Sequence, residues 1–205
     1  MCKKYFLMTI ILVTLLLEGC SSIYNKNLIS MNQLENIDNY SLSSNLNQIQ
    51  WIYIYYKKAN LALSRAMIER LILMNPNHPN MDYVLYLLGM IDMRLDYNLI
   101  LNFFKIDQSD RDPEYARAAL YDFYHLMHRY PNSKYIPDAR KHVIYLKERL
   151  AKYELLVADF YLKRCAYVAV INRVKQMMLD YPHTKSTYMA LSIMKTAYKK
   201  LYYMK

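Results

Sequence analysis

Glycine is almost absent from this sequence, whose 205 residues include only Gly19 and Gly89. Tight β-hairpins, phosphate-binding loops and strand-to-helix elbows use glycine at backbone angles that other residues avoid. The scarcity of glycine therefore argues against nucleotide-loop enzymes and against a fold rich in hairpins. It favours helices.

The sequence also lacks the short motifs on which most enzyme assignments rest. It contains no G-x-S-x-G, no P-loop, no H-E-x-x-H and no C-x-x-C pattern. We therefore expect a protein that is not an enzyme, with no catalytic residue, no cofactor and no bound metal.

One alternative, a metal-dependent enzyme, stays open on two groups of residues. The first group is Asp107, Asp110 and Asp112, and the second is His125 with His128, three residues apart on a predicted helix. The aspartates do not have calcium-loop spacing. We interpret Asp112 as a helix cap, whose side-chain oxygen accepts from free backbone N–H groups, and the histidines as surface or packing residues.

The N-terminus has the pattern of a secretory signal. Lys3 and Lys4 precede an apolar run over residues 5–17, which is shorter than the ~20 residues that a membrane span needs. The run ends at Leu17-Glu18-Gly19-Cys20, and a cysteine after a small residue, with leucine three places earlier, resembles the lipobox of bacterial lipoproteins. That resemblance implies that residues 1–19 are removed and that Cys20 is acylated. The alternative is a leader with an incidental cysteine.

The lipobox resemblance also implies a location. Acyl chains hold a protein on a bilayer without a transmembrane helix, and a serine after the cysteine, here Ser21, goes with export to the outer membrane in lipoproteins. Glu18 departs from the usual small or apolar residue. Because Cys2 would leave with the leader, Cys165 has no partner for an intramolecular disulfide, and we interpret it as a small packing residue in a helix.

Basic residues outnumber acidic ones, and the formal net charge is +10. Such a surface suits acidic partner proteins or anionic lipid headgroups. Nucleic acid is not expected as a partner outside the cytoplasm.

The rest of the chain divides into a tether and a helical body. Residues 20–46 are rich in Ser and Asn, and we interpret them as a tether with a degenerate first repeat and a weak helix near Met31–Asp38. Residues 47–205 show apolar residues at helical spacing. Helices are expected at Gln48–Lys58, Asn80–Asp96, Tyr135–Leu150 running on into Lys152–Arg164, and from Ser186 onward, with an insertion at Tyr97–Arg111.

Three proline-containing segments mark a repeat: Asn75-Pro76-Asn77-His78, Tyr130-Pro131-Asn132-Ser133 and Tyr181-Pro182-His183-Thr184. Apolar residues stand eight, five and four positions before each proline: Ile68, Leu71 and Ile72; Phe123, Leu126 and Met127; Val174, Met177 and Met178. Compact residues stand twelve positions before it: Ser64, Ala119 and Val170. This pattern resembles the second helix of a tetratricopeptide repeat. We expect an all-α, tetratricopeptide-like solenoid of four to five repeats, the first and last incomplete. The alternative is an irregular helical bundle.

Longer segments carry a resemblance to a family. Residues 55–59 (YYKKA), 73–84 (LMNPNHPNMDYV), 109–113 (SDRDP), 129–133 (RYPNS) and 146–154 (LKERLAKYE) look like the BamD (YfiO/ComL) family of outer-membrane assembly lipoproteins, and the resemblance extends from Leu34 to Tyr198. It implies a scaffold facing the periplasm within the β-barrel assembly (BAM) complex. Its implied partners are the periplasmic domain of BamA, other BAM lipoproteins and unfolded outer-membrane proteins. The alternative is a lipoprotein scaffold with another envelope role, such as docking cell-wall factors.

One site follows from this resemblance. The segment of residues 168–174 (VAVINRV) is similar to the family stretch whose arginine faces BamA, so Arg173, with Asn172 beside it, is the expected partner-binding residue. A solvated surface arginine is the alternative. Compared with the family, the first helix of the first repeat and the second helix of the last are expected to be missing, which fits the reduced, A/T-rich genome of an endosymbiont.

Overall fold

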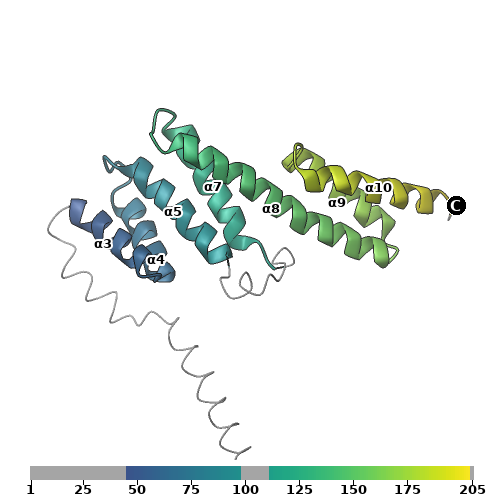
Figure 1. The fold of residues 1–205 in the computed structure, drawn as a ribbon, viewed down its shortest axis with the longest axis horizontal. Helices are drawn as coiled ribbons and strands as arrows, with labels where there is room; N and C mark the ends of the chain where they lie inside the picture. Colours follow the sequence, from purple (N-terminus) through teal and green to yellow (C-terminus); the bar gives the residue numbers. More distant parts are fainter. Residues whose placement is uncertain (1–44, 98–110, 204–205) are drawn as a thin grey trace, which may run out of the picture. The chain divides into compact units, whose positions relative to one another are not determined.

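The computed structural model describes residues 45–97 and 111–203, and within them every regular element is an α-helix (Figure 1). The helices are α3 (Asn45–Lys57), α4 (Leu61–Met74), α5 (Met81–Asp96), α7 (Glu114–Arg129), α8 (Ile136–Lys163), α9 (Tyr167–Asp180) and α10 (Lys185–Tyr203). The prediction of an all-α, tetratricopeptide-like fold is confirmed. The expected leader, most of the tether and most of the insertion lie outside the described residues, and Asn45 and Leu46, at the end of the expected tether, already belong to α3.

The described residues fall into two compact units, and the boundary between them lies between Met67 and Ile68, within α4. In the first unit, α3 and the start of α4 cross at Ser64, whose side chain is fully buried. Its hydroxyl donates to the backbone oxygens of Asn60 at 2.9 Å and, across the crossing, of Ile52 at 3.4 Å. A small residue was expected at this position, and the close approach of the two backbones is the reason for it.

Two helix connections use a left-handed residue that is not glycine. Ala59 follows α3 with φ of 59°, and Cys165 follows α8 with φ of 60°. The two turns share one hydrogen-bond pattern, in which the next residue's N–H donates to a carbonyl five positions back: Asn60 to Tyr55 and Ala166 to Tyr161, both at 3.0 Å. This is the Schellman termination that usually carries glycine. The expectation that Cys165 packs inside a helix is therefore wrong, because the residue is exposed in a turn.

The three proline segments form the same turn. In each, the N–H two positions after the proline donates to the carbonyl of the residue before it: His78 to Asn75 at 3.1 Å, Ser133 to Tyr130 at 3.0 Å and Thr184 to Tyr181 at 3.3 Å. The side chains of His78, Ser133 and Thr184 then accept a hydrogen bond from a backbone N–H two or three residues further on. These acceptors satisfy donors at the start of the next helix, so the sequence repeat is also a structural repeat.

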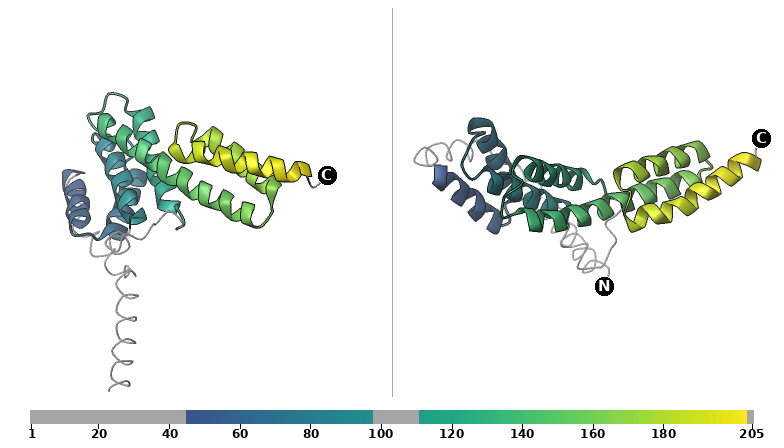
Figure 2. Two further views of the ribbon diagram at one scale, coloured as in Figure 1. Left: turned by 45° about the vertical axis from the view of Figure 1, so that its right-hand side comes forward. Right: turned by 90° about the horizontal axis from the view of Figure 1, so that it is seen from above.

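In the second unit, α5 packs on α7, α7 on α8, and both α9 and α10 pack on α8 (Figure 2). Close packing between α5 and α7 depends on Gly89, because a Cβ atom at this position would lie 2.8 Å from two ring carbons of Phe123. Phe123 is itself fully buried. Leu85 and Leu88, on α5 with Gly89, are buried as well.

Helix α8 is 28 residues long and belongs to both halves of this unit. Its C-terminal half forms a core with α9 and α10, to which Ala151, Ala158, Val174, Met177, Ala190 and Ala197 contribute. Glu148 of α8 also accepts hydrogen bonds from the backbone N–H groups of Lys185 and Ser186 at 2.8 and 3.0 Å. The first turn of α10 is thus capped by a carboxylate from a different helix.

Aromatic rings line the contact between α5 and the start of α8. Tyr86 stacks on Tyr135 with ring centroids 4.9 Å apart, and its hydroxyl donates to Asp138 at 2.7 Å. His142 lies 3.1 Å from the same carboxylate and stacks on Phe123. The hydrogen bond from Tyr86, with a smaller contribution from His142, holds the pKa of Asp138 below its usual value.

Not every apolar stripe of the sequence is core. Of the tyrosines in α3, Tyr53 is exposed, and of the paired methionines in α9 Met177 is buried while Met178 is exposed. The residues four positions before the three prolines are Ile72, Met127 and Met178. The first two are only partly buried and the third is exposed, so this position lies at the edge of the helix interface.

Candidate partner-binding site on helix α9

Helix α9 carries both expected binding residues on its outer side. Its inner face is fixed by Val170, Val174 and Met177, which are buried at helical spacing. Asn172 is exposed, and the side chain of Arg173 is 38% exposed at the flank of the buried face. The two side chains can therefore be reached from outside while the helix stays packed.

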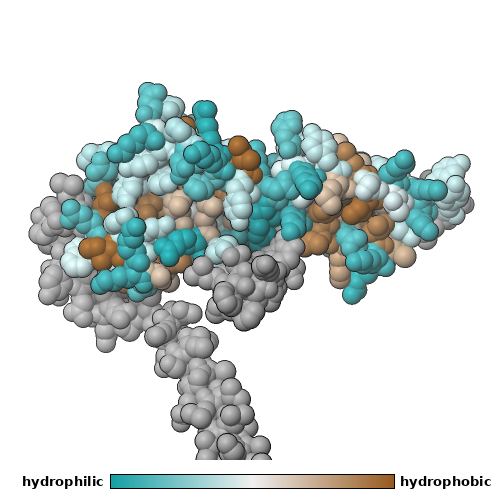
Figure 3. Space-filling view, viewed as in Figure 1, coloured by the Kyte–Doolittle hydropathy of each residue, from teal (hydrophilic) through white to brown (hydrophobic). Residues whose placement is uncertain are grey.

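Apolar residues lie on the same outer side of α9. Val168 is 58% and Leu179 75% exposed, and they share a helix face with Asn172 because they lie four positions before and seven positions after it. Figure 3 shows apolar side chains between polar ones over α8 to α10. Exposed apolar residues around a polar group are typical of a protein-binding surface.

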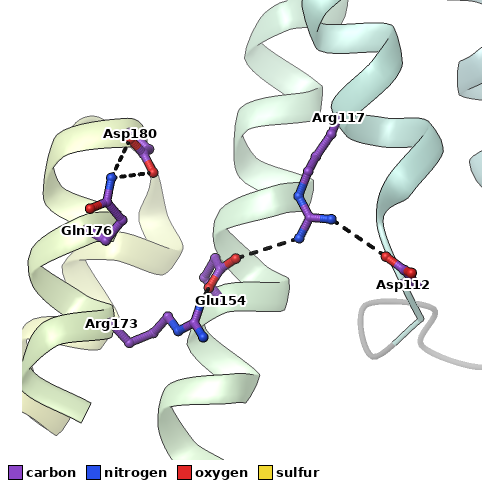
Figure 4. Close-up of polar contacts among 6 residues, drawn as sticks. All are labelled: Asp112, Arg117, Glu154, Arg173, Gln176 and Asp180. Atoms are coloured by element: carbon purple, nitrogen blue, oxygen red, sulfur yellow. Dashed lines mark hydrogen bonds and ion pairs between the residues drawn. The ribbon is translucent and has the colours of Figure 1, made fainter. Parts of the chain in front are cut away.

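The guanidinium of Arg173 is held by Glu154 of α8 (Figure 4). Arg173 Nη1 lies 2.9 Å from Glu154 Oε2, and the Glu154 side chain is only 15% exposed. A guanidinium has five N–H donors in a planar fork. One of them is used in this contact, so the group can still hold a second carboxylate.

A second arginine approaches the other oxygen of Glu154. Arg117 Nη2 of α7 lies 3.9 Å from Glu154 Oε1, and Arg117 Nη1 lies 3.6 Å from Asp112 Oδ1 (Figure 4). Arg117 also lies over the ring of Tyr153 at 5.8 Å. The result is a chain of alternating charges across three helices, from Asp112 through Arg117 and Glu154 to Arg173.

The interpretation of Asp112 as a helix cap is wrong. The residue before α7 is Pro113, which has no side chain able to accept a hydrogen bond, and no side chain caps this N-terminus. The carboxylate of Asp112 is instead directed at Arg117, five positions along the chain. An ion pair with a guanidinium replaces the expected hydrogen bonds to the backbone.

Tyr181 lies at the end of α9, close to these charges. Burial raises the pKa of its phenol, and the carboxylates of Asp180 and Glu154 raise it further, while Arg117 lowers it. Asp180 itself accepts both hydrogen bonds of the Gln176 amide, at 2.9 and 3.0 Å (Figure 4). The Gln176 amide thus holds the Asp180 carboxylate on the outer side of α9.

The residues weighed for metal binding do not come together in the described part of the chain. Asp107 and Asp110 lie outside it, His125 is half-buried against the ring of Tyr121, and His128 is exposed. Residues 45–97 and 111–203 hold no group of three His, Cys, Asp or Glu side chains that could bind a metal. Cys20, the expected lipidation site, also lies outside the described residues.

None of the described helices has both the length and the apolar composition needed to cross a bilayer. The length of α8 is sufficient, but charged side chains recur along it.

Glu154 and Arg117 were not singled out from the sequence as site residues. Glu154 stands in the LAKYE segment that resembles the family, but nothing local marks it as a partner of Arg173, 19 positions away. Only the packing of α7 and α9 against α8 brings these three side chains together.

Comparison with known proteins points in one direction. A family model described as "Outer membrane lipoprotein" (YfiO) matches residues 21–205. The outer membrane protein assembly factor BamD of Vibrio cholerae is 47% identical over 154 residues, which are 75% of this chain and 64% of that protein. The protein of the same name from Buchnera aphidicola is 37% identical over 161 residues, 78% of this chain and 65% of that protein. The Neisseria gonorrhoeae protein of that name is 40% identical over 154 residues, 75% of this chain and 58% of its own length. The matched part thus spans 58% to 65% of the length of these relatives.

Proposed function

Because this chain belongs to the YfiO family of outer membrane lipoproteins, we propose that it is a scaffold of the β-barrel assembly complex, needed for folding and insertion of outer-membrane β-barrel proteins. The names of its relatives, outer membrane protein assembly factors, support this role. A solenoid of stacked helical hairpins suits it, because such a fold offers an extended surface to polypeptides. On this proposal the protein holds other proteins and catalyses no reaction.

The same proposal assigns the parts of the chain. Residues 1–19 act as the lipoprotein signal, Cys20 carries the acyl chains that hold the protein on the periplasmic face of the outer membrane, and residues 20–46 tether the helical domain of residues 47–205. The Leu-Glu-Gly-Cys pattern supports this assignment. Mass spectrometry of the native protein should find diacylglycerol and a further acyl chain on Cys20, and an unmodified N-terminus would contradict it.

The outer side of α9 is the proposed contact with the periplasmic domain of BamA. The observation that carries this proposal is the position of Arg173: partly exposed, already oriented by Glu154, and next to the exposed Asn172. An acidic BamA residue would bind the remaining N–H donors of the guanidinium as a charge-assisted pair. The exposed Val168 and Leu179, on the neighbouring face of α9 with Asn172, would add apolar contact with the same partner. Other BAM lipoproteins and unfolded outer-membrane proteins are the further proposed partners.

The test is charge reversal at the centre of this surface. Arg173→Glu places a carboxylate opposite the acidic BamA residue, and we expect about a 30-fold or greater loss of affinity for the purified BamA periplasmic domain. Arg140→Glu is the matched control, because Arg140 is exposed on the first half of α8 and carries the same charge change. In co-purification from detergent-solubilised membranes, Arg173→Glu should lose BamA and Arg140→Glu should retain it. Equal recovery of BamA with both variants would refute the proposed contact and favour another envelope role, such as docking cell-wall factors.

A further inference from the structure

We propose that Arg117, on a different helix from Arg173, is a second specificity residue of the α9 surface, because it neutralises Glu154 and so keeps Arg173 able to hold an external carboxylate. This inference rests on the proposed function, since it requires an acidic partner residue at Arg173. It adds a residue 56 positions away in the sequence that does not itself touch the partner.

The geometry gives each oxygen of Glu154 its own arginine. Oε2 lies 2.9 Å from Arg173 and Oε1 lies 3.9 Å from Arg117. The Glu154 side chain is the most buried member of the set, at 15% exposure, whereas the two arginines are 38% and 50% exposed. A carboxylate so little exposed to water is poorly screened, so its charge acts strongly on any group that approaches Arg173.

Without Arg117, Glu154 would have a single counterion. Both of its oxygens could then bind the fork of Arg173 in the bidentate geometry that carboxylates and guanidinium groups favour. Such a pair is neutral and has fewer donors left for a partner. A carboxylate arriving from outside would also be repelled by Glu154, so Arg173 alone gives a weak acid-binding site.

With Arg117 in place, the group of Arg117, Glu154 and Arg173 carries a net charge of +1. Asp112 opposes this effect, but its side chain is 77% exposed and 3.6 Å from Arg117, so water screens most of its charge. Asp180, at the end of α9, is also exposed, so water screens its charge as well, and the amide of Gln176 holds its carboxylate in place. The excess positive charge therefore falls on the exposed side of Arg173, which makes the site selective for a carboxylate rather than for a neutral amide.

A double-mutant cycle on the full-length protein tests this inference, with the BamA periplasmic domain as the probe. Arg117→Ala should weaken binding by about two- to fivefold, and Glu154→Gln should strengthen it by a similar factor, the range that one partly exposed ion pair supplies. Gln at position 154 still accepts a hydrogen bond from Arg173 but carries no charge. In the Glu154→Gln background, Arg117→Ala should therefore have a clearly smaller effect, because no charge at position 154 is left for Arg117 to neutralise. Arg117→Lys should retain the affinity, and Arg140→Ala is the matched control.

The outcomes separate this inference from the proposed function. A loss from Arg117→Ala that is the same in both backgrounds would mean that Arg117 contacts the partner directly, and the inference would be overturned. No loss in either background would overturn it as well. Insensitivity of binding to Arg173→Glu would instead remove the proposed function. Thermal unfolding of each variant, followed by circular dichroism, checks that the helices are intact. If Arg117→Ala lowers Tm, and Arg117→Lys restores Tm but not binding, the inference is also overturned.

Discussion

Replacing Cys165 with glycine should stabilise the protein. Cys165 adopts φ of 60° in the turn between α8 and α9. At this angle the Cβ atom of any residue except glycine lies too close to the backbone. The turn cannot relax to a more favourable angle, because the N–H groups of Cys165 and Ala166 each donate across it at 3.0 Å, to Leu162 and Tyr161. The side chain is exposed, so removing it leaves no cavity.

The magnitude follows from two opposing terms. A residue with a Cβ atom in the left-handed region costs roughly 1–2 kcal/mol, which glycine avoids. Glycine gives the unfolded chain more freedom, which costs about 0.5–1 kcal/mol on folding. A hydrogen bond with the Cys165 thiol raises the pKa of the Tyr167 phenol, and this exposed contact would be lost. The net gain is about 0.5–1 kcal/mol, which raises Tm by about 1–4 °C in a protein of this size.

The assay is thermal and urea unfolding under reducing conditions, followed by circular dichroism at the helix band. Cys165→Ala is the first control, because it removes the thiol but keeps the Cβ atom, and it should not be stabilising. Cys165→Val should lower Tm, since a β-branched side chain tolerates this angle poorly. Ala59→Gly, at φ of 59° in the first unit, should repeat the gain in an unrelated position. If glycine lowers Tm at both positions, the reasoning from backbone angle is wrong.

Two further predictions concern the contacts of α5. Gly89→Ala should destabilise the protein by about 1–3 kcal/mol, because the new methyl group meets the buried ring of Phe123 at 2.8 Å. The same substitution in a Phe123→Leu background should cost less stability. If the two substitutions lower Tm additively, the proposed clash is contradicted. Tyr86→Phe removes the hydrogen bond that lowers the pKa of Asp138, so it should cost about 0.5–1 kcal/mol at neutral pH, a small value because the carboxylate is half exposed. A carboxylate whose pKa is lowered in the folded state stabilises the protein above the ordinary value of 3.8, and this contribution is lost as the pH falls through the pKa of folded Asp138. The free energies of urea unfolding of wild type and Tyr86→Phe should therefore become equal in acid. If they still differ at pH 2, lost packing is the cause instead.

Much of the helical body is readable from the sequence because its signals are local. The prolines at positions 76, 131 and 182 end helices of the same apolar spacing, and the structure shows the same turn at all three. The run from residues 135 to 164 has no breaker after its start, and it forms the single helix α8. Ser64 could be expected at a helix crossing because only a compact side chain fits there.

The errors have physical causes of a different kind. Asp112 stands where a cap is favoured, but Arg117 competes for its carboxylate, and the strength of that competition is not visible in the local pattern. A left-handed turn residue is usually glycine, so the two turns at Ala59 and Cys165 could not be predicted from the residue types. Glu154 could not be connected to Arg117, 37 positions away, before the packing of α7 on α8 was known.

The unbroken course of α8 has a mechanical consequence. Turns separate α7, α8, α9 and α10 from one another, but α8 itself is one helix of 28 residues, about 42 Å long, that runs from the contact with α7 to the contact with α9 and α10. Bending it would break backbone hydrogen bonds along its middle. A displacement of α9 by a bound partner would therefore be transmitted through α8 to α7, because no turn interrupts the helix between them.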